Sequence, residues 1–555
     1  MDIFSIDEDN KNDINVEGCA LENRRHINIK KIQFFLSCLR LALFLQVRKE
    51  QFPMVSVVHI TGILLTVALL VLVSWLSGRK VKDAHSFTTG GKSGSWMVCG
   101  ALLGTLAGGQ STIGTAQLAF CYGVSAWWFT IGAGLGSLVL GLFYTGPLRR
   151  SGCTTLLVVV SREYGHKAET VGSILFLIGI FISIVSQVLS SSAMITSLLG
   201  IHLVWAALAS AVLIMLLVLF GGIRSAGAGG IVKLVLLYIS SVVAGVVVWH
   251  IAGGWTGLRE SIDHIYLDTP NLAGLNELSD IESIHHRYGS PFARGFFKDM
   301  GGCLSLILGV VCTQSYAQCI WSAATTAKAR RGALLCSLFM PIIGAACTLV
   351  GLYMRGHYIT SSELAGIQRM GETIPAGLGV IDGTALAFPV FVLEHLPDWL
   401  GGLLLGTMLI NILGCGSGLS LGASTILVRD VYGNLKRRLG MKVSPLSQLS
   451  QTRWSIVGIL MLAFVVAILF NGSFINDLGF LSLGLRAVAI LFPLSFALWC
   501  PGRFNARRVL MSMPVGVAVM LLANSTSLPG DAVYYGLAAS LLVILTSAPH
   551  FFKQH

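Results

Sequence analysis

Long apolar runs alternate with short polar connectors along most of the chain, from residue 54 to residue 548. A helix needs roughly 20 apolar residues to cross the hydrocarbon core of a bilayer, and most of these runs approach or exceed that length. The pattern predicts an all-α polytopic membrane protein with about thirteen transmembrane helices. We place them at 55–76, 94–119, 124–147, 168–198, 203–220, 228–250, 296–320, 332–353, 399–427, 454–470, 478–499, 509–524 and 532–548.

Residues 1–53 differ from the rest because they are rich in polar and charged residues, and their apolar run near 33–46 is too short to span a bilayer. They do not form a clean signal peptide, since the charged leader is long and no small-residue cleavage site follows it. We expect this segment to be a disordered N-terminal extension, or to lie upstream of a true start of translation at Met54.

The charge pattern adds an orientation. The chain has 555 residues, of which 54% are hydrophobic and 12% are charged, and its formal net charge is +12. Basic residues concentrate in alternate connectors, such as 149–150, 328–331 and 436–438, while the long connectors 251–295 and 354–398 hold most of the acidic loop residues. Because basic connectors face the cytoplasm, we expect a multi-pass protein of the cell membrane with its N-terminus outside and its C-terminus inside.

Several classes of function lack their sequence signatures. The basic residues are not interleaved with aromatic residues, so the net charge does not indicate a nucleic-acid partner. The 12 cysteines form no CxxC pair and no metal-ligand spacing, and no Walker A motif, nucleophile elbow or HExxH motif is present. We therefore expect neither ATP-driven transport nor an enzyme, and no cofactor beyond a coupling ion, sodium or proton.

The segment from Gly104 to Gly114 carries four glycines and a Gln-Ser-Thr cluster inside a run long enough to cross a bilayer. Each glycine weakens a helix by roughly 1 kcal/mol relative to alanine, and irregular backbone at membrane depth must be buried in protein or line a water-filled cavity. An interrupted membrane helix indicates a midplane binding site in a secondary transporter. The alternative is close helix packing through small residues.

Several motifs occur in the same order and at similar spacing in a known transporter family. From about Thr61 to Trp499 the chain resembles the sodium:solute symporter family, as a divergent member. The matching segments are Phe87–Lys92 with Trp96, Gly104–Gly114 with Tyr122-Gly123, Thr154 with Arg162 and Tyr164, Phe220–Ile223, Gln318 with Ala323-Ala324 and Lys328–Gly332, Phe388-Pro389, Ser424-Thr425 with Asp430–Tyr432, and Pro493 with Trp499.

The resemblance implies a LeuT-type fold with a core of two inverted five-helix repeats. The ten-helix core would occupy 92–500, one helix at 54–80 would precede it, and two helices at 501–555 would follow it. Substrate would bind at the midplane, between the broken first and sixth core helices, and alternating access would move one helix bundle against the rest.

The resemblance also implies a sodium site between the first and eighth core helices, from which this sequence departs. The carbonyl ligands match Gly104 and Ala107, and a third contact matches Asn411. The two positions that carry hydroxyls in the family read Gly414 and Cys415 here, and a thiol is a poor ligand for a hard cation. Ser417 and Ser420 lie within the next two turns and would serve if the register differs.

A second departure lies on the fifth core helix, where the family often has an acidic residue and then Gln, and this chain has Gly230 and Lys233. A lysine in a membrane helix usually faces a cavity or a partner. One hypothesis is that the Lys233 ammonium takes the place of sodium or carries a proton, which would make transport sodium-independent. The alternatives are snorkelling to the interface and a hydrogen bond to backbone carbonyls.

Neutral polar groups on three core helices form the expected substrate site. They are Gln110, Ser111 and Thr112 on the first, Ser186 and Gln187 with Ser190–Ser192 on the third, and Thr313, Gln314 and Tyr316 on the sixth. Serines also connect membrane helices as polar packing groups. Arg486, in the tenth core helix, would bind an anionic substrate, line a vestibule, or bond to carbonyls near the interface. A small organic anion or a neutral polar solute fits these residues better than a cation.

We therefore expect a secondary active transporter that moves a small organic solute across the cytoplasmic membrane. The alternative is a transporter-like membrane sensor that binds the solute without moving it. The expected partners are the solute and the lipid bilayer, and the sequence gives no oligomeric state.

Overall fold

The computed structural model describes residues 55–78, 93–153, 155–221, 229–278, 280–371, 377–433, 445–470, 472–526 and 528–546. The extension expected at 1–53 lies outside these ranges, as does the side chain of Lys233, although its backbone belongs to a helix.

The first part of the chain is mostly helical in its described ranges. In chain order its elements are α2 (Val57–Gly78), α4 (Ser95–Leu106), η1 (Gln110–Gly114), α5 (Thr115–Tyr122), η2 (Gly123–Trp127), α6 (Trp128–Val139), η3 (Leu140–Tyr144), α7 (Thr145–Arg150), α8 (Leu156–Tyr164), α9 (His166–Leu199), α10 (Leu203–Gly221) and α11 (Gly229–Ile251).

The second part adds one small parallel sheet, in which Tyr358 of β1 lies opposite Gly379 of β2. Its elements are α12 (Gly254–Asp268), α13 (Pro270–Leu275), α14 (Ile281–Gly289), α15 (Phe296–Val311), α16 (Gln314–Trp321), α17 (Thr326–His357), β1 (Tyr358–Thr360), α18 (Ser361–Arg369), β2 (Gly379–Ile381), η5 (Thr384–Leu386), α19 (Ala387–His395), α20 (Asp398–Thr425), η6 (Ile426–Tyr432), α22 (Pro445–Leu469), α23 (Ile475–Trp499), α24 (Ala506–Ser525) and α25 (Ala532–Leu545).

Local signals set several helix ends. Long helix α9 ends at Gly200, whose left-handed φ of 58° is accessible to glycine at little cost. The Thr325 side chain accepts a hydrogen bond from the Lys328 amide and so caps the start of α17. These ends agree with the predicted spans at 168–198 and 332–353 to within a few residues, except that α17 begins earlier, at Thr326.

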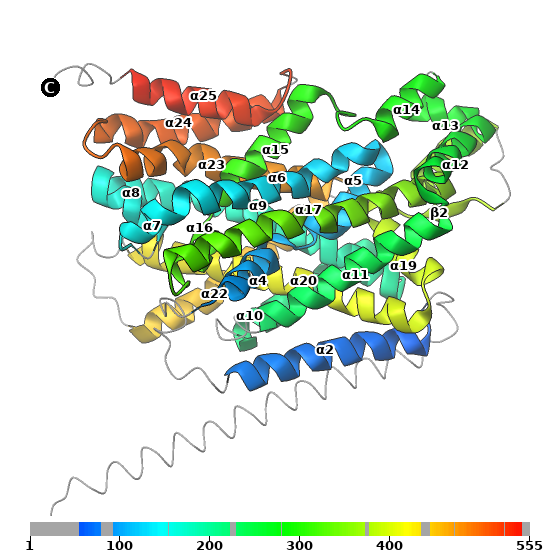
Figure 1. The fold of residues 1–555 in the computed structure, drawn as a ribbon, viewed down its shortest axis with the longest axis horizontal. Helices are drawn as coiled ribbons and strands as arrows, with labels where there is room; N and C mark the ends of the chain where they lie inside the picture. The colour runs from blue at the N-terminus through cyan, green and yellow to red at the C-terminus, as the bar shows by residue number, and fades with distance from the viewer. Residues whose placement is uncertain are drawn as a thin grey trace, which may run out of the picture.

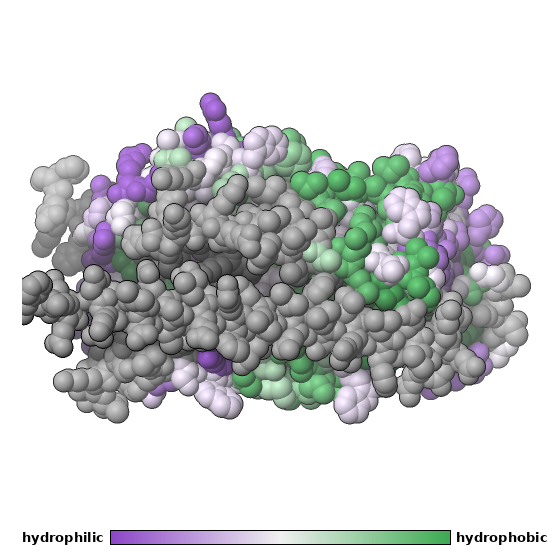
Figure 2. All heavy atoms as spheres, turned by 90° about the horizontal axis from the view of Figure 1, so that it is seen from below, coloured by the Kyte–Doolittle hydropathy of each residue, from purple (hydrophilic) through white to green (hydrophobic). Residues whose placement is uncertain are grey.

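Seven helices of the described ranges are long and apolar enough to cross a membrane, and the number rises to nine if each of two bent helix pairs counts as one span. Large apolar side chains such as Leu65, Trp205, Leu338, Trp454 and Leu469 are exposed. Figure 2 shows apolar residues over a broad area of one face, with hydrophilic residues mainly toward its ends. Exposed apolar surface of this extent is typical of contact with lipid. The count of about thirteen spans and the inverted repeats remain predictions.

Most helices run along the long axis of the molecule (Figure 1). Helices α12, α13 and α14 gather at one end with β2, and α7, α8 and α16 lie toward the other; we call these the α12 end and the α8 end. Helix α2 packs on α20 through glycines, since a Cβ on Gly62 would lie 2.9 Å from the Gly402 Cα. Small residues let membrane helices approach closely in this way.

Backbone hydrogen bonds join three elements at the α8 end. The Ser93 amide, before α4, donates to the Ser322 carbonyl (3.2 Å), and the Ala324 amide donates to the Ser93 carbonyl (3.0 Å). Arg149 of α7 donates through Nη1 to the carbonyls of Ile320 (3.0 Å) and Ala323 (2.8 Å), at the end of α16. A basic side chain at a helix C-terminus satisfies carbonyls that have no partner within the helix.

Candidate functional site

The first core helix is interrupted between α4 and the π-helical turn η1. Helix α4 ends at Leu106, and Ala107 leaves the helical conformation with φ −83° and ψ 76°. The chain becomes helical again at Gln110. The backbone amide of Gly109 donates to Gln187 Oε1 of α9 (3.1 Å). The side-chain amide of Asn411, on α20, donates through Nδ2 to the Ala107 carbonyl. Neighbouring helices therefore supply the hydrogen bonds that the break removes, as irregular backbone in a membrane requires.

The glycines of the break permit close packing as well. A Cβ on Gly108 would lie 3.0 Å from Gln187 Nε2, and a Cβ on Gly109 would lie 2.3 Å from the Ser190 Cβ. The packing interpretation and the interrupted-helix interpretation therefore hold for the same residues.

A second interruption separates α15 from α16, which are bent by 47° at Cys312 and Thr313. The Thr313 hydroxyl donates to the Gly309 carbonyl (2.7 Å) and accepts from Arg486 Nη1 (3.2 Å). Tyr316, one turn beyond the bend, is buried.

A small cavity lies between the two interruptions. Its volume is about 20 Å³, which is space for one or two water molecules. Helices α4, α6, α9, α15, α16, α20 and α23 and the turn η1 contribute the lining residues, which are Thr105, Leu106, Gln110, Phe129, Ala133, Ser183, Gln187, Leu306, Tyr316, Cys415, Leu419, Leu483 and Arg486. This volume is too small for an organic solute, so binding of one would require these side chains to move apart.

Arg486 is the charged member of this lining, and only 1% of its surface is exposed. Its Nη2 donates to the Ser183 hydroxyl (2.5 Å) and to the Ser482 hydroxyl (2.6 Å). Its guanidinium carbon lies 5.8 Å from the ring centroid of Phe176. The sequence had singled out Arg486 as an intramembrane charge, but it had not identified the two serines that hold it.

The predicted substrate residues occupy different environments. Gln110, Gln187 and Tyr316 line the cavity, and Ser186 accepts a hydrogen bond from Gln110 Nε2 (2.6 Å). The remaining predicted residues bond elsewhere: Ser111 donates to the Leu106 carbonyl, Thr112 donates to the Gly108 carbonyl, Ser190, Ser191 and Ser192 donate to carbonyls of their own helix, and Gln314 Oε1 accepts from the Leu156 amide at 2.8 Å.

The predicted ion-site residues also meet, at the contact of α4 with α20. The Cys415 thiol donates to the Thr105 carbonyl (3.6 Å), and the Ser417 hydroxyl donates to the Gly414 carbonyl (2.8 Å). Together with Asn411 on Ala107, two side chains of α20 direct donors at carbonyls of the first core helix. A cation bound at this position would need oxygen ligands from α20, whereas these two side chains present hydrogen-bond donors. Gly104 lies on α4 beside this contact, and the side chain of Lys233 lies outside the described part of the chain.

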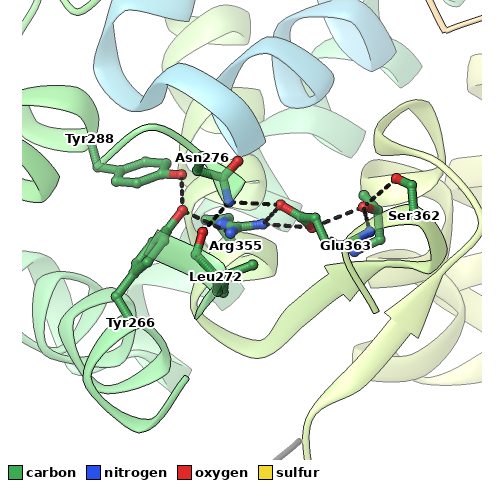
Figure 3. Close-up of polar contacts among 8 residues, drawn as sticks. Tyr266, Leu272, Asn276, Tyr288, Arg355, Ser362 and Glu363 are labelled. Carbon is green, nitrogen blue, oxygen red and sulfur yellow. Dashed lines mark hydrogen bonds and ion pairs between the residues drawn. The ribbon is translucent and has the colours of Figure 1, made fainter. Parts of the chain in front are cut away.

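Sequence reasoning missed a buried polar network at the α12 end (Figure 3). Arg355, at the end of α17 and 1% exposed, donates to both Glu363 oxygens (3.0 and 3.1 Å) and to the Tyr266 hydroxyl (2.7 Å). Tyr266 in turn bonds Tyr288 (2.7 Å). The Arg355 guanidinium also lies over the ring of Phe120 in α5, 5.1 Å from its centroid. The network thus joins α12, α14, α17 and α18 to the second half of the first core helix.

Charge and burial act against each other at Glu363. Burial alone would raise the pKa of this carboxyl, but the Arg355 charge and donors from Thr360 and Asn276 outweigh it and lower the pKa. Burial raises the pKa of Tyr288 well above its ordinary value, so this hydroxyl stays neutral. One signal was available in the sequence: Thr360 and Glu363 form a capping box at the start of α18.

Comparison with known proteins gives a family match. The model of a family described as the sodium:solute symporter family matches residues 86–516. The uncharacterized symporter YwcA of Bacillus subtilis (strain 168) is 22% identical over 479 residues, which cover 85% of this chain and 87% of that protein.

Two animal transporters are similar over a smaller share. Sodium/glucose cotransporter 1 of Sus scrofa is 23% identical over 372 residues, which cover 64% of this chain and 55% of the cotransporter. High-affinity choline transporter 1 of Drosophila melanogaster is 22% identical over 427 residues, which cover 75% of this chain and 63% of that protein. The match thus spans little more than half of the glucose cotransporter.

Solved structures share the fold. A Na⁺-coupled sialic acid symporter, in a substrate-bound outward-open state, gives a TM-score of 0.63 at 16% identity, covering 89% of this chain and 97% of that one. Mhp1 in an inward-facing conformation gives a TM-score of 0.50 at 12% identity, covering 84% and 92%. At these identities the likeness concerns the fold alone, and that fold is shared with LeuT-type transporters.

Proposed function

Because the chain belongs to the sodium:solute symporter family, whose relatives are solute transporters, we propose that it is a secondary active transporter that moves a small organic solute by alternating access. The observation that carries the proposal is the small cavity between the interrupted helices, which Gln110 and Tyr316 line from those helices and Gln187 lines from α9. Interrupted helices at membrane depth present backbone and side-chain polar groups to a solute that the bilayer excludes.

The proposal includes the finer architecture expected from the sequence. Thirteen spans would comprise α2, a ten-helix core of two inverted repeats, and the pair α24 and α25. The basic connectors at the α8 end would face the cytoplasm, with the N-terminus outside and the C-terminus inside.

Coupling to sodium at the position used by the family is not part of the proposal. The carbonyls of Thr105 and Ala107 already accept hydrogen bonds from Cys415 and Asn411. Gly414 has no side-chain oxygen, and a thiol does not replace one, because sodium is a hard cation that prefers oxygen ligands. These contacts support transport that is driven by protons, without sodium at this site.

Reconstituted proteoliposomes test both parts. We expect counterflow of a labelled solute that is equally fast in sodium and in N-methylglucamine buffers. Strict dependence on sodium would contradict the coupling part alone. Solute binding without counterflow, in vesicles whose protein is correctly folded, would contradict transport and favour a sensor.

A further inference from the structure

Arg486 is a buried cation with neutral partners only. Among the described residues, its hydrogen bonds go to the hydroxyls of Thr313, Ser183 and Ser482 and to the Gly179 carbonyl (3.5 Å). No described Asp or Glu lies within ion-pair distance of it, whereas Arg294 and Arg355 each pair with a carboxylate. A charge inside a membrane protein normally pairs with an opposite charge or marks a substrate pathway.

The fold makes specific room for this side chain. A Cβ on Gly179 would lie 2.8 Å from the Arg486 Cγ and 3.3 Å from its Nε, so glycine at this position leaves the space that the arginine occupies. Ser183 and Ser482 also bond each other (2.6 Å). The guanidinium is therefore held by hydrogen-bond acceptors on α9 and α23 rather than by a counter-charge.

One donor of the guanidinium remains unused. Nε of Arg486 is buried and makes no hydrogen bond with the described residues, and Arg486 lines the cavity between the interrupted helices. The unused Nε–H can donate to one oxygen of a carboxylate, and the charge of the guanidinium strengthens such a hydrogen bond.

We propose that Arg486 binds the carboxylate of the transported solute, and that the solute is a small organic monocarboxylate; this inference rests on the proposed function. The described lining holds a single permanent charge, so a monoanion neutralises it and a second carboxylate would lie unpaired. The apolar members Phe129, Leu306 and Leu483 suit a short carbon chain. Gln110 and Gln187 suit a hydroxyl or keto oxygen on it.

The same charge argues against the other classes of solute. A quaternary ammonium compound would meet an unpaired guanidinium at low dielectric, where like charges repel strongly. A neutral sugar would leave the buried charge of Arg486 uncompensated.

The test compares acids with their amides on the full-length protein in lipid nanodiscs. Acetate, propionate, lactate and pyruvate are each paired with the corresponding amide, and choline and glucose serve as further probes. Binding is measured as ligand-induced thermal stabilisation and by calorimetry, for the wild type, for Arg486→Gln and for Arg507→Gln. Arg507 is exposed at the start of α24, so its variant makes the same charge change away from the cavity.

We expect at least one acid to bind, its amide to bind at least about 30-fold more weakly, and Arg486→Gln to lose a similar factor while Arg507→Gln does not. Equal binding of acid and amide, or undiminished acid binding by folded Arg486→Gln, would overturn the inference. If Arg486→Gln does not fold, the acid-to-amide ratio of the wild type decides alone. If glucose or choline binds and none of the acids does, the monocarboxylate is refuted; counterflow of the bound solute in the proteoliposomes described above would leave the transport proposal standing.

Discussion

Replacing Gly109 by alanine tests how tightly the break in the first core helix packs on α9. Gly109 has φ −60° and ψ −31°, an ordinary helical conformation that alanine adopts without strain. The reason for glycine is therefore steric. A Cβ at this position would lie 2.3 Å from both Cβ and Oγ of Ser190, far inside van der Waals contact.

The size of the effect follows from this overlap. Adding a methyl group to a fully packed position costs about 1–3 kcal/mol. The better helix propensity of alanine offsets at most about 1 kcal/mol of this cost. Ser190→Gly removes both clashing atoms and itself costs about 1 kcal/mol as a glycine within a helix. The double variant should therefore be no less stable than Ser190→Gly alone, which gives a coupling energy of about 1–3 kcal/mol.

The assay is the free energy of unfolding of the four proteins in mixed micelles, measured by titration with a denaturing detergent. Gly418→Ala is the matched control, because Gly418 is exposed within α20 and a Cβ added there would meet no atom within 4 Å; it should be neutral or stabilising. Additive effects of Gly109→Ala and Ser190→Gly would refute the steric reasoning.

Three further perturbations follow from other contacts. Gln187→Met removes the acceptor of the Gly109 amide and should lower the free energy of unfolding by about 1–3 kcal/mol. The control is Gln318→Met, at an exposed position on α16, which should change the free energy of unfolding by less than about 0.5 kcal/mol. Equal effects of the two substitutions would show that the Gly109–Gln187 hydrogen bond is not needed. Because the pKa of Glu363 is lowered in the folded state, its ion pair stabilises the protein at neutral pH and is lost as the pH falls through that lowered pKa. The melting temperature of the wild type should therefore fall more steeply on acidification than that of Glu363→Gln, and parallel curves would contradict this. The double change Gly414→Ser and Cys415→Ser supplies two hydroxyls beside Ala107 and should create a sodium-dependent thermal stabilisation that the wild type lacks, so an identical response of the two proteins to sodium would argue against our account of the ion site.

The membrane-embedded part of the fold was predictable because its signals are local. A bilayer requires long apolar runs, and glycines with polar neighbours mark an interruption, so Gly104 to Gly114 indicated the break that lies at Ala107 to Gly109. The family resemblance indicated Tyr316 and Gln187, which line the cavity. Gln314 shows where such a prediction fails. It lies next to the break between α15 and α16, but its side chain accepts a hydrogen bond from the Leu156 amide.

Contacts between distant elements were not predictable from these signals. The connectors 251–295 and 354–398 appeared as long polar loops, yet they contain helices α12, α13, α14, α18 and α19 and a small sheet. Arg355 joins these connectors, because it bonds Tyr266, which lies 89 residues away in the sequence, and Glu363, which lies 8 residues away. Ser183 and Ser482 were equally hidden, because only the packing of α9 against α23 reveals that they hold Arg486.

The backbone bonds of Ser93 give the α8 end a mechanical property. The start of α4 and the end of α16 share two peptide hydrogen bonds, and Arg149 ties the same end of α16 to α7. Separating α4 from α16 would break both of these hydrogen bonds, at a net cost of about 0.5–1.5 kcal/mol for each bond when water replaces the lost partners. The two halves of the interrupted helices that lie at the α8 end, α4 and α16, are therefore linked by backbone hydrogen bonds, and a tilt of one that keeps these bonds would move the other with it.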